Sequence, residues 1–302
     1  MKSQNKKEGY CPLCKSNARF LFKKNKHDFF ECLSCRFKFI YPLPKSAEIE
    51  KYYQDEYWDS AVYRGESSLG YASYLGERDS ILDYFQKILE GLKKAYPKLN
   101  GRVLDIGCSF GLFLELAQKE NWEIYGLDLS PTPVKKAKKR LGTKNIFNVG
   151  LEKAKFKDCY FDLVTIFQTI EHVDNLEKFL NEIHRILKPK GVILITTPNA
   201  SGWQAKIMGS SWFAYRHPDH LSFFNFENLR TLLKKKGFVN IRAFKDPTRL
   251  YPFGYLLENV KFYYRGKFLV GLSNVIKRIV GPLGVIKIPI PLVSIVLTAQ
   301  KK

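Results

Sequence analysis

Residues 102–111 read RVLDIGCSFG, and this stretch decides the fold of the chain. It opens with apolar residues at strand spacing and then turns through Gly107 and Gly111. It continues into LFLELAQ, residues 112–118, a pattern that predicts a helix. Glycine allows the positive φ angles of such a turn, and the first N–H groups of a helix lack intrahelical partners. The stretch therefore predicts a strand, a small-residue turn and a helix N-terminus that bind a ligand close to the backbone.

The spacing of the small residues distinguishes between two kinds of nucleotide-like ligand. Dinucleotide enzymes carry G-x-G-x-x-G after the first strand. Here Asp105 stands two residues before Gly107, and Ser109 precedes the next glycine, so the pattern is Asp-x-Gly-x-Ser-x-Gly. A second apolar run, residues 124–127, ends on Asp128, whose carboxylate oxygens can accept both hydroxyls of a ribose. The alternative is an ordinary strand-to-helix turn that carries an acid by chance.

These residues resemble the class I S-adenosylmethionine-dependent methyltransferases. In that family an acid-x-Gly-x-Gly-x-Gly loop holds the amino acid end of the cofactor, and a later acid binds its ribose. Ser109 stands where the family often has its middle glycine, a departure that keeps a small side chain. The resemblance covers residues 99–245. The cofactor-binding residues that it implies are Asp105, Gly107, Ser109, Gly111, Asp128, Leu129, Leu151, Glu152 and Gln168.

Strand and helix patterns alternate from Gly101 onward. Strands are predicted at 102–106, 123–128, 145–149, 161–167, 191–197, 238–244 and 292–300. Helices are predicted at 111–121, 131–141, 175–187 and 226–236. This alternation predicts an α/β fold with a mainly parallel sheet, helices on both faces and right-handed crossovers. The family resemblance implies a seven-stranded Rossmann-like methyltransferase sheet whose last strand is antiparallel.

Four of the six cysteines form two tight pairs near the N-terminus: Cys11, Cys14, Cys32 and Cys35. The spacing C-x2-C-x17-C-x2-C is typical of zinc, and four thiolates around one ion leave no open position, which indicates a structural site. Apolar runs at 19–22 and 29–31 predict short strands between the pairs, and hence a zinc ribbon. An iron–sulfur centre is the alternative, although nothing nearby suggests electron transfer. The ribbon itself could bind nucleic acid or serve as a packing module.

The composition is that of a folded protein with a small appendage. The chain has 302 residues, of which 45% are hydrophobic and 15% aromatic, which argues against disorder. The predicted divisions are a zinc ribbon at 1–44, a helical linker or lid at 45–98, and a methyltransferase domain at 99–302. Tyrosines of the linker are predicted to pack in the core or to line the cofactor site. Residues 1–9 lack the apolar core of a signal peptide, and the paired C-x-x-C thiols favour a reducing compartment, so a cytoplasmic location is expected.

Positive charge is concentrated toward the C-terminus. The net charge is +21, and residues 230–302 hold fifteen lysines and arginines against two acidic residues. Such a field favours anionic partners, although solvated surface lysines explain it equally well. Segment 249–291 interleaves apolar and basic residues, which predicts either peripheral contact with an anionic membrane, at its inner face, or a cover over the acceptor site. The apolar run 279–297 is long enough for a membrane span, but its glycines and prolines argue against one.

A candidate acceptor site follows the fifth predicted strand, in WFAYRHPDHLSFF, residues 212–224. This segment resembles one in a subgroup of bacterial methyltransferases that carry Trp…Pro-x-His-Leu-x-Phe-Phe. Methyl transfer to a hydroxyl requires removal of a proton, so we predict His220 as general base, with Asp219 or Tyr215 orienting it or the acceptor. Alternatively, His220 fixes the loop by hydrogen bonds, or His217 and His220 bind a metal.

The predicted function is S-adenosylmethionine-dependent O-methylation of a sugar, glycan or small metabolite. Methylation of amino groups in nucleobases or protein amides usually requires an Asn/Asp-Pro-Pro-aromatic segment after the fourth strand, where this chain has QTIE, residues 168–171. An RNA methyltransferase and a nucleic-acid-binding protein on an inactive methyltransferase fold are the alternatives. Glu171 and His172 are predicted either to orient the cofactor or to cap the following helix.

Overall fold

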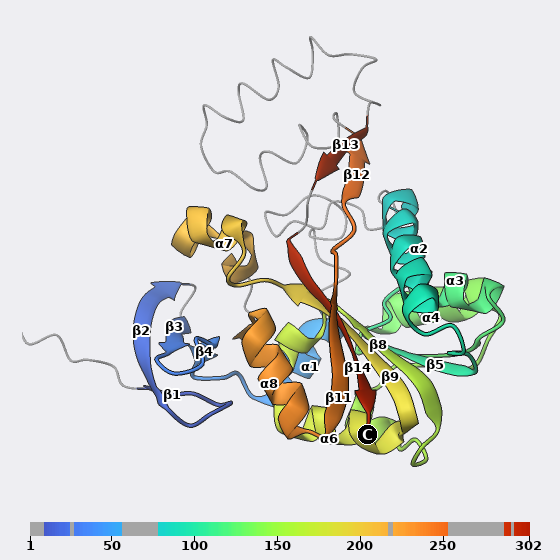
Figure 1. Cartoon of the computed structure of the whole chain (residues 1–302), viewed down its shortest axis with the longest axis horizontal. Helices are drawn as coiled ribbons and strands as arrows, with labels where there is room; N and C mark the ends of the chain where they lie inside the picture. The colour runs from blue at the N-terminus through green and yellow to red at the C-terminus, as the bar shows by residue number, and fades with distance from the viewer. Residues whose placement is uncertain (1–8, 25–26, 56–77, 217–219, 253–286, 291–292) are drawn as a thin grey trace, which may run out of the picture.

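The computed structural model describes residues 9–24, 27–55, 78–216, 220–252, 287–290 and 293–302 (Figure 1). Within these residues the strands form a five-stranded N-terminal sheet, a seven-stranded central sheet and a two-stranded ladder. The ladder pairs β12 (Arg249–Pro252) with β13 (Lys287–Ile290) at the base of the C-terminal insertion. The rest of that insertion, residues 253–286, lies outside the described residues and includes the segment predicted to touch membrane. No helix in the described part of the chain is long and apolar enough to cross a membrane.

The central sheet has the order β11-β14-β9-β8-β5-β6-β7. Its strands are β5 (Arg102–Ile106), β6 (Glu123–Leu127), β7 (Ile146–Phe147), β8 (Phe161–Phe167), β9 (Leu187–Pro198), β11 (Phe238–Phe244) and β14 (Ser294–Lys301). β14 runs antiparallel to both of its neighbours, whereas β5, β6, β7, β8 and β9 pair in parallel. The structure thus confirms the predicted seven-stranded α/β sheet and its antiparallel last strand.

Helices cover both faces of the central sheet (Figure 1). They are α1 (Ser46–Asp55), α2 (Arg78–Ala95), α3 (Leu112–Lys119), α4 (Pro131–Leu141), α5 (Leu151–Ala154), α6 (Leu176–Ile186), α7 (Trp203–Met208) and α8 (Phe226–Lys235), with 3-10 turns η1 (Ile170–His172), η2 (Gly209–Ser211) and η3 (Phe213–Arg216). Because side chains alternate along a strand, Val103 packs with α2, α3 and α4, whereas Leu104 packs with α6 and α8 on the other face.

Asparagine side chains cap two of these helices. The Asn175 side chain accepts the Lys178 N–H at the start of α6, and Asn225 forms a capping box with Asn228 at the start of α8. The alternative in which Glu171 or His172 caps the helix after β8 is therefore wrong. These two residues lie in η1 instead.

The N-terminal sheet is antiparallel and includes a strand from outside the ribbon. Its strands are β1 (Gly9–Tyr10), β2 (Asn17–Lys24), β3 (His27–Cys32), β4 (Lys38–Tyr41) and β10 (Ser222–Phe223). β10 pairs with β4, with Ser222 opposite Phe39. The ribbon therefore shares a sheet with the segment that was predicted to hold the acceptor site.

The ribbon and the central sheet also share an apolar core. Phe37 and Phe224 are both fully buried, and their ring centroids lie 5.2 Å apart. Phe37 belongs to the same buried cluster as the α6 and α8 side chains that cover the sheet. Truncation of either ring opens a cavity at the junction of the two parts, because the surrounding structure relaxes only partly.

We expect Phe224→Ala to lower the free energy of unfolding by about 3–5 kcal/mol, the usual cost of removing a buried phenylalanine ring. Phe20→Ala is the matched control, because Phe20 lies in the same ribbon sheet but is 41% exposed. Its substitution should cost less than half as much. Urea unfolding, followed by tryptophan fluorescence, measures the free energy of unfolding of both variants. Equal losses of stability in the two variants would contradict the shared core.

Candidate active site

The loop after β5 fits tightly against two neighbouring segments. The N–H groups of Gly107 and of the next residue both donate to the Leu127 carbonyl, at 2.8 and 2.9 Å. Gly107 has φ 78°, and a Cβ there would lie 2.2 Å from Thr169 Oγ1, so no larger residue fits. Ser109 and Gly111 also have positive φ, 48° and 68°, which turns the chain into α3. The loop thus turns tightly at the ends of β5 and β6, where Gly107 and Ser109 remain partly exposed.

Asp128 follows β6 and holds two backbone segments together. Its Oδ2 accepts the Ser109 N–H and its Oδ1 accepts the Ser130 N–H, both at 2.8 Å. The Asn148 amide donates to its backbone carbonyl at 3.0 Å. Burial raises the pKa of Asp128, and the N–H donors and the nearby His172 offset part of that rise. Each carboxylate oxygen has a second lone pair, so the pair of oxygens suits two adjacent hydroxyls such as those of a ribose.

Asp105 lies buried in β5, close to Asp128. Its Oδ1 accepts the Thr165 hydroxyl at 2.7 Å. Burial, together with the charge of Asp128, raises the pKa of Asp105 to about 8 despite the Thr165 bond. Two acids in one buried place disfavour each other's ionised forms, and a cationic ligand relieves that repulsion. S-adenosylmethionine carries both a diol and positive charge, so these residues fit the cofactor that the resemblance implies.

The remaining predicted cofactor residues lie at the same edge of the sheet or just beyond it. Leu129 is half-buried, Leu151 is buried at the start of α5, and Glu152 is exposed on that helix. Gln168 directly follows β8 and has φ 47°, and its N–H donates to the Thr196 carbonyl at 2.9 Å. Its side-chain amide donates to the Thr196 hydroxyl at 3.3 Å. The individual roles of these residues remain predictions.

His220 lies in a buried position beside η1. Its Nδ1 donates to the Ala214 carbonyl at 2.9 Å, which fixes the ring. The next residue, Leu221, donates its N–H to the Glu171 carbonyl at 2.8 Å, so the chain entering β10 runs along η1. The rings of His220 and His172 have centroids 4.7 Å apart. The structure therefore brings the predicted base beside two residues that lie in a different segment of the sequence.

Glu171 and His172 are each held by a neighbouring side chain. Glu171 is buried, and its Oε2 accepts the Thr197 hydroxyl at 2.9 Å. The Nδ1 of His172 is hydrogen-bonded to the Tyr53 hydroxyl of α1 at 3.0 Å. His172 also lies close enough to Asp128 to lower its pKa. These contacts place η1 between the cofactor loop and His220, a juxtaposition that the sequence analysis missed.

Of the other two predicted catalytic residues, the structure describes Tyr215 but not Asp219. Tyr215 is buried, and its phenol oxygen accepts a hydrogen bond from the Lys38 ammonium at 3.2 Å. Burial raises the pKa of Tyr215. Its ring packs at the ribbon junction against Phe22, Phe29, Trp212 and Phe223. Asp219 and His217 lie outside the described residues, so the prediction for Asp219 and the alternative for His217 remain untested.

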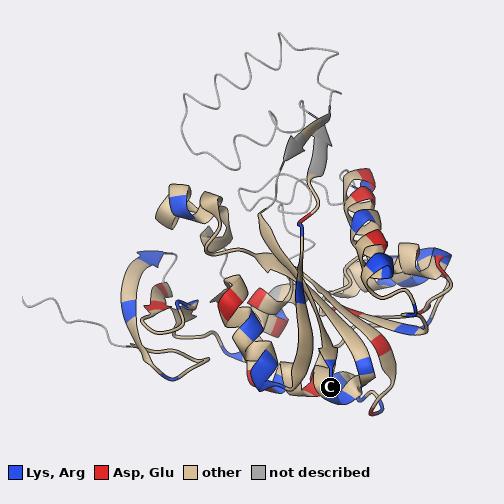
Figure 2. Cartoon of the chain, in the orientation of Figure 1, with Lys and Arg blue, Asp and Glu red and all other residues tan. Residues whose placement is uncertain are grey.

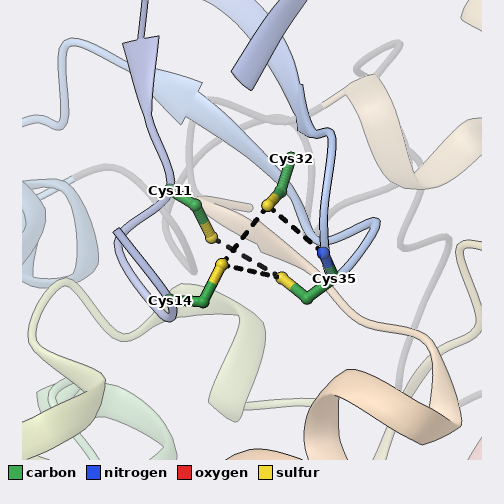
Figure 3. Close-up of side chains that lie close together, drawn as sticks. All are labelled: Cys11, Cys14, Cys32 and Cys35. Carbon is green, nitrogen blue, oxygen red and sulfur yellow. Dashed lines mark hydrogen bonds between the residues drawn. The ribbon is translucent and has the colours of Figure 1, made fainter. Parts of the chain in front are cut away.

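The four paired cysteines converge at the tips of the ribbon, with their sulfurs pointing toward one another (Figure 3). The Cys14 sulfur lies 3.4 Å from the Cys32 sulfur and 3.6 Å from the Cys35 sulfur, and the sulfurs of Cys11 and Cys35 lie 3.7 Å apart. The edge of a tetrahedron of sulfurs around zinc is about 3.8 Å when each Zn–S bond is about 2.3 Å. The hydrogen bond with the Cys35 thiol lowers the pKa of Cys11 to about 5. The arrangement fits a structural zinc ion.

The sequence profile of a family described as "Methyltransferase domain" matches residues 77–243, more than half of the chain. The chain belongs to this family, and its fold and cofactor loop are those of the class I S-adenosylmethionine-dependent methyltransferases. The ribbon and the C-terminal insertion lie outside the matched region.

Relatives and solved structures agree with this assignment. A probable S-adenosylmethionine-dependent methyltransferase of Mycobacterium tuberculosis is 27% identical over 48% of this chain and 52% of its own length. A ubiquinone biosynthesis O-methyltransferase of Bartonella tribocorum is 26% identical over 48% of this chain and 63% of its own length. The chain spans about half the length of the first of these relatives. The structure of a putative sarcosine dimethylglycine methyltransferase from Galdieria sulphuraria, 18% identical, covers 84% of this chain and 98% of its own, with a TM-score of 0.52, and shows the same fold.

We expect the affinity for S-adenosylmethionine to rise with pH between about pH 6 and pH 7.5, by up to about tenfold per unit. Asp105 holds its proton up to about pH 8 in the free protein, and a cationic ligand favours its ionised form, so binding releases that proton. The same raised pKa makes the contribution of Asp105 to folding less favourable as pH rises from 3.8 toward 8.

Calorimetry in buffers with different ionisation enthalpies counts the released proton. Asp105→Asn is the control, because its amide cannot ionise, and its affinity profile over this range should be flatter. Identical profiles for the two proteins would show that Asp105 does not respond to the cofactor.

Proposed function

We propose that this protein is an S-adenosylmethionine-dependent methyltransferase that acts on a hydroxyl oxygen of a small molecule, a sugar or a glycan. The observation that carries the proposal is the pair of acids at the glycine loop, buried Asp105 and half-buried Asp128. The match to a ubiquinone biosynthesis O-methyltransferase supports oxygen as the methylated atom. A cytoplasmic location is part of this proposal.

The cofactor supplies an electrophilic methyl group on a sulfonium sulfur. The residues of this chain hold and orient it: Asp128 accepts the ribose hydroxyls, and the loop from Gly107 to Gly111 offers close backbone contact. Asp105 contributes negative charge beneath the loop, once ionised. Correct placement of the two reactants accounts for much of the acceleration of such a displacement.

His220 activates the acceptor hydroxyl. Because its Nδ1 donates to a carbonyl, the neutral ring carries its lone pair on Nε2. With no metal ion bound to His220, its Nε2 accepts the hydroxyl proton. The acceptor oxygen bonds to the methyl carbon as the carbon–sulfur bond breaks, and the electron pair of that bond stays on sulfur. The Glu171 carboxylate nearby stabilises the imidazolium that forms.

We expect His220→Ala to lower turnover by about 10²- to 10⁴-fold, the usual contribution of a positioned acid or base. Cofactor affinity should stay within about twofold, because Asp128 and the glycine loop hold the cofactor without it. His184→Ala is the matched control, because His184 lies on α6, half-buried, and its ring packs against Phe238 of β11. A panel of hydroxylated acceptors with radiolabelled cofactor measures turnover, and normal turnover in His220→Ala would remove this residue from the mechanism.

We also propose that the four ribbon cysteines bind one structural zinc ion. Metal binding stabilises the ribbon, which is too small to bury much core of its own. The ribbon in turn supports β10, because Ile40 N–H donates to the Leu221 carbonyl at 3.1 Å and β4 pairs with β10. Zinc thereby acts on the position of His220 through the shared sheet.

We expect Cys11→Ser to lose about one zinc ion per chain and most of the turnover, while cofactor binding weakens much less. Cys159→Ser is the control, because Cys159 is exposed and lies far from the cluster in sequence. Zinc content by mass spectrometry and cofactor affinity by calorimetry separate the two effects. Equal loss of cofactor affinity and turnover would show that the ribbon supports the whole fold rather than the acceptor side.

An RNA acceptor and peripheral membrane contact have less support. Figure 2 shows acidic residues interspersed with basic ones on several described elements, although α4 carries Lys135, Lys136, Lys138, Lys139 and Arg140 without an acid. The relatives' names point to neither partner. The RNA prediction rests on the charge and the ribbon, and the membrane prediction rests on segment 249–291, of which residues 253–286 lie outside the described residues.

A further inference from the structure

We propose that Glu171, His172 and His220 form a binding site for a divalent transition-metal ion of the zinc class, separate from the cysteine cluster. Each residue offers one ligand atom, and the three atoms lie within 4.8 Å of one another. Two imidazoles and one carboxylate are a ligand set that zinc and related ions use in catalytic sites. Glu171 and His220 are buried, so the ligands are held in a protected place.

The hydrogen bonds around the two imidazoles support this assignment. Metal-binding histidines almost always use their other ring nitrogen as a donor to a carbonyl, carboxylate or similar acceptor, which fixes the tautomer and aims the ligand nitrogen. His220 Nδ1 donates to the Ala214 carbonyl, and His172 Nδ1 is bonded to the Tyr53 hydroxyl, whose oxygen can accept from it. In the neutral His220 ring this leaves the lone pair on Nε2, and in His172 the same follows when Nδ1 is the donor to the Tyr53 hydroxyl.

The carboxylate ligand is oriented in the same way. Glu171 Oε2 accepts the Thr197 hydroxyl at 2.9 Å, and the backbone of Glu171 is held by the Leu221 N–H. With neutral imidazoles the cluster carries one negative charge, and Asp128 adds a second nearby. A divalent cation therefore balances charge at a place where Glu171 and His220 are buried.

The position of the site indicates what the ion does. η1 follows β8 directly and lies against the glycine loop, since Thr169 contacts Gly107. Three protein ligands leave at least one coordination position for an oxygen atom of the acceptor. Coordination lowers the pKa of a hydroxyl, so its proton can pass to solvent while the oxygen takes the methyl group and the carbon–sulfur bond breaks. This role rests on the proposed function; binding of the ion does not.

Zinc content per chain tests the site directly. The native chain, saturated with zinc and dialysed, should hold about two zinc ions, one at the cysteines and one at the new site. His172→Ala and His220→Ala should each hold about one. A mercurial that blocks thiols should release the remaining ion from both variants, because only thiolates hold it. His184→Ala, the matched control, should keep about two.

Each result of these zinc measurements either supports or contradicts the metal site. If the native chain holds only the thiol-bound ion, and cobalt and manganese give the same result, the metal site is wrong and direct proton removal by His220 stands. If a second ion binds but survives both histidine substitutions, it lies elsewhere and the assignment is wrong. His172 is half-buried, so its variant covers the case in which His220→Ala fails to fold. Cofactor binding by calorimetry is scored independently: its absence would overturn the proposed methyltransferase and leave the zinc count interpretable.

Discussion

The backbone N–H and C=O of Leu221 join the ribbon to the segment that follows β8, and the proposed acceptor side of the site depends on these two bonds. The Leu221 carbonyl accepts the Ile40 N–H of the ribbon, and the Leu221 N–H donates to the Glu171 carbonyl of η1. The two peptide units that flank Leu221 therefore join the ribbon, the segment entering β10 and η1 in one hydrogen-bonded structure. Because His220 precedes Leu221, its backbone cannot move without disturbing one of these bonds, and its ring is held by the bond from Nδ1 to the Ala214 carbonyl. Backbone hydrogen bonds between buried segments are costly to leave unmade, so the position of His220 is set by the fold rather than by its own side-chain contacts alone.

The cofactor side depends on different forces. Asp128 accepts two N–H groups, and Asp105 accepts one hydroxyl, yet burial still raises the pKa of both acids. The fold thus keeps two carboxylates together at the ends of β5 and β6 in a place that disfavours their charge. A purely structural pair of residues in that place would be better apolar, because replacing buried ionic groups by well-packed apolar ones is often neutral or stabilising. The acids are best explained by a ligand that carries hydroxyls and positive charge.

Local pattern was enough to predict most of the central sheet, and it failed where pairing is short or distant. β5, β8 and β11 have the predicted bounds, because each is a continuous or alternating apolar run. β9 begins at Leu187, four residues before the predicted start. Leu187 already pairs with Phe161 of β8, and the register shifts between Phe161 and Leu163 before the regular pairing continues. β10 has only two residues, too few to show any period, and its partner β4 lies far away in the sequence. The four cysteines were predictable because their spacing alone specifies the metal geometry.

The cluster of Glu171, His172 and His220 shows why the candidate site was only half predictable. The cofactor residues follow consecutive strands, and the carboxyl ends of parallel strands meet at one edge of the sheet, so order along the chain implies proximity. Glu171 and His172 follow β8, and this rule placed them near the cofactor. His220 reaches them only because the chain after β9 passes through α7, η2 and η3 and then returns along η1 to pair with the ribbon. No periodicity encodes that return. Its cause is the apolar packing of Phe37 on Phe224 and the pairing of β10 with β4, so the position of His220, the proposed base, depends on a contact made outside the seven-stranded sheet.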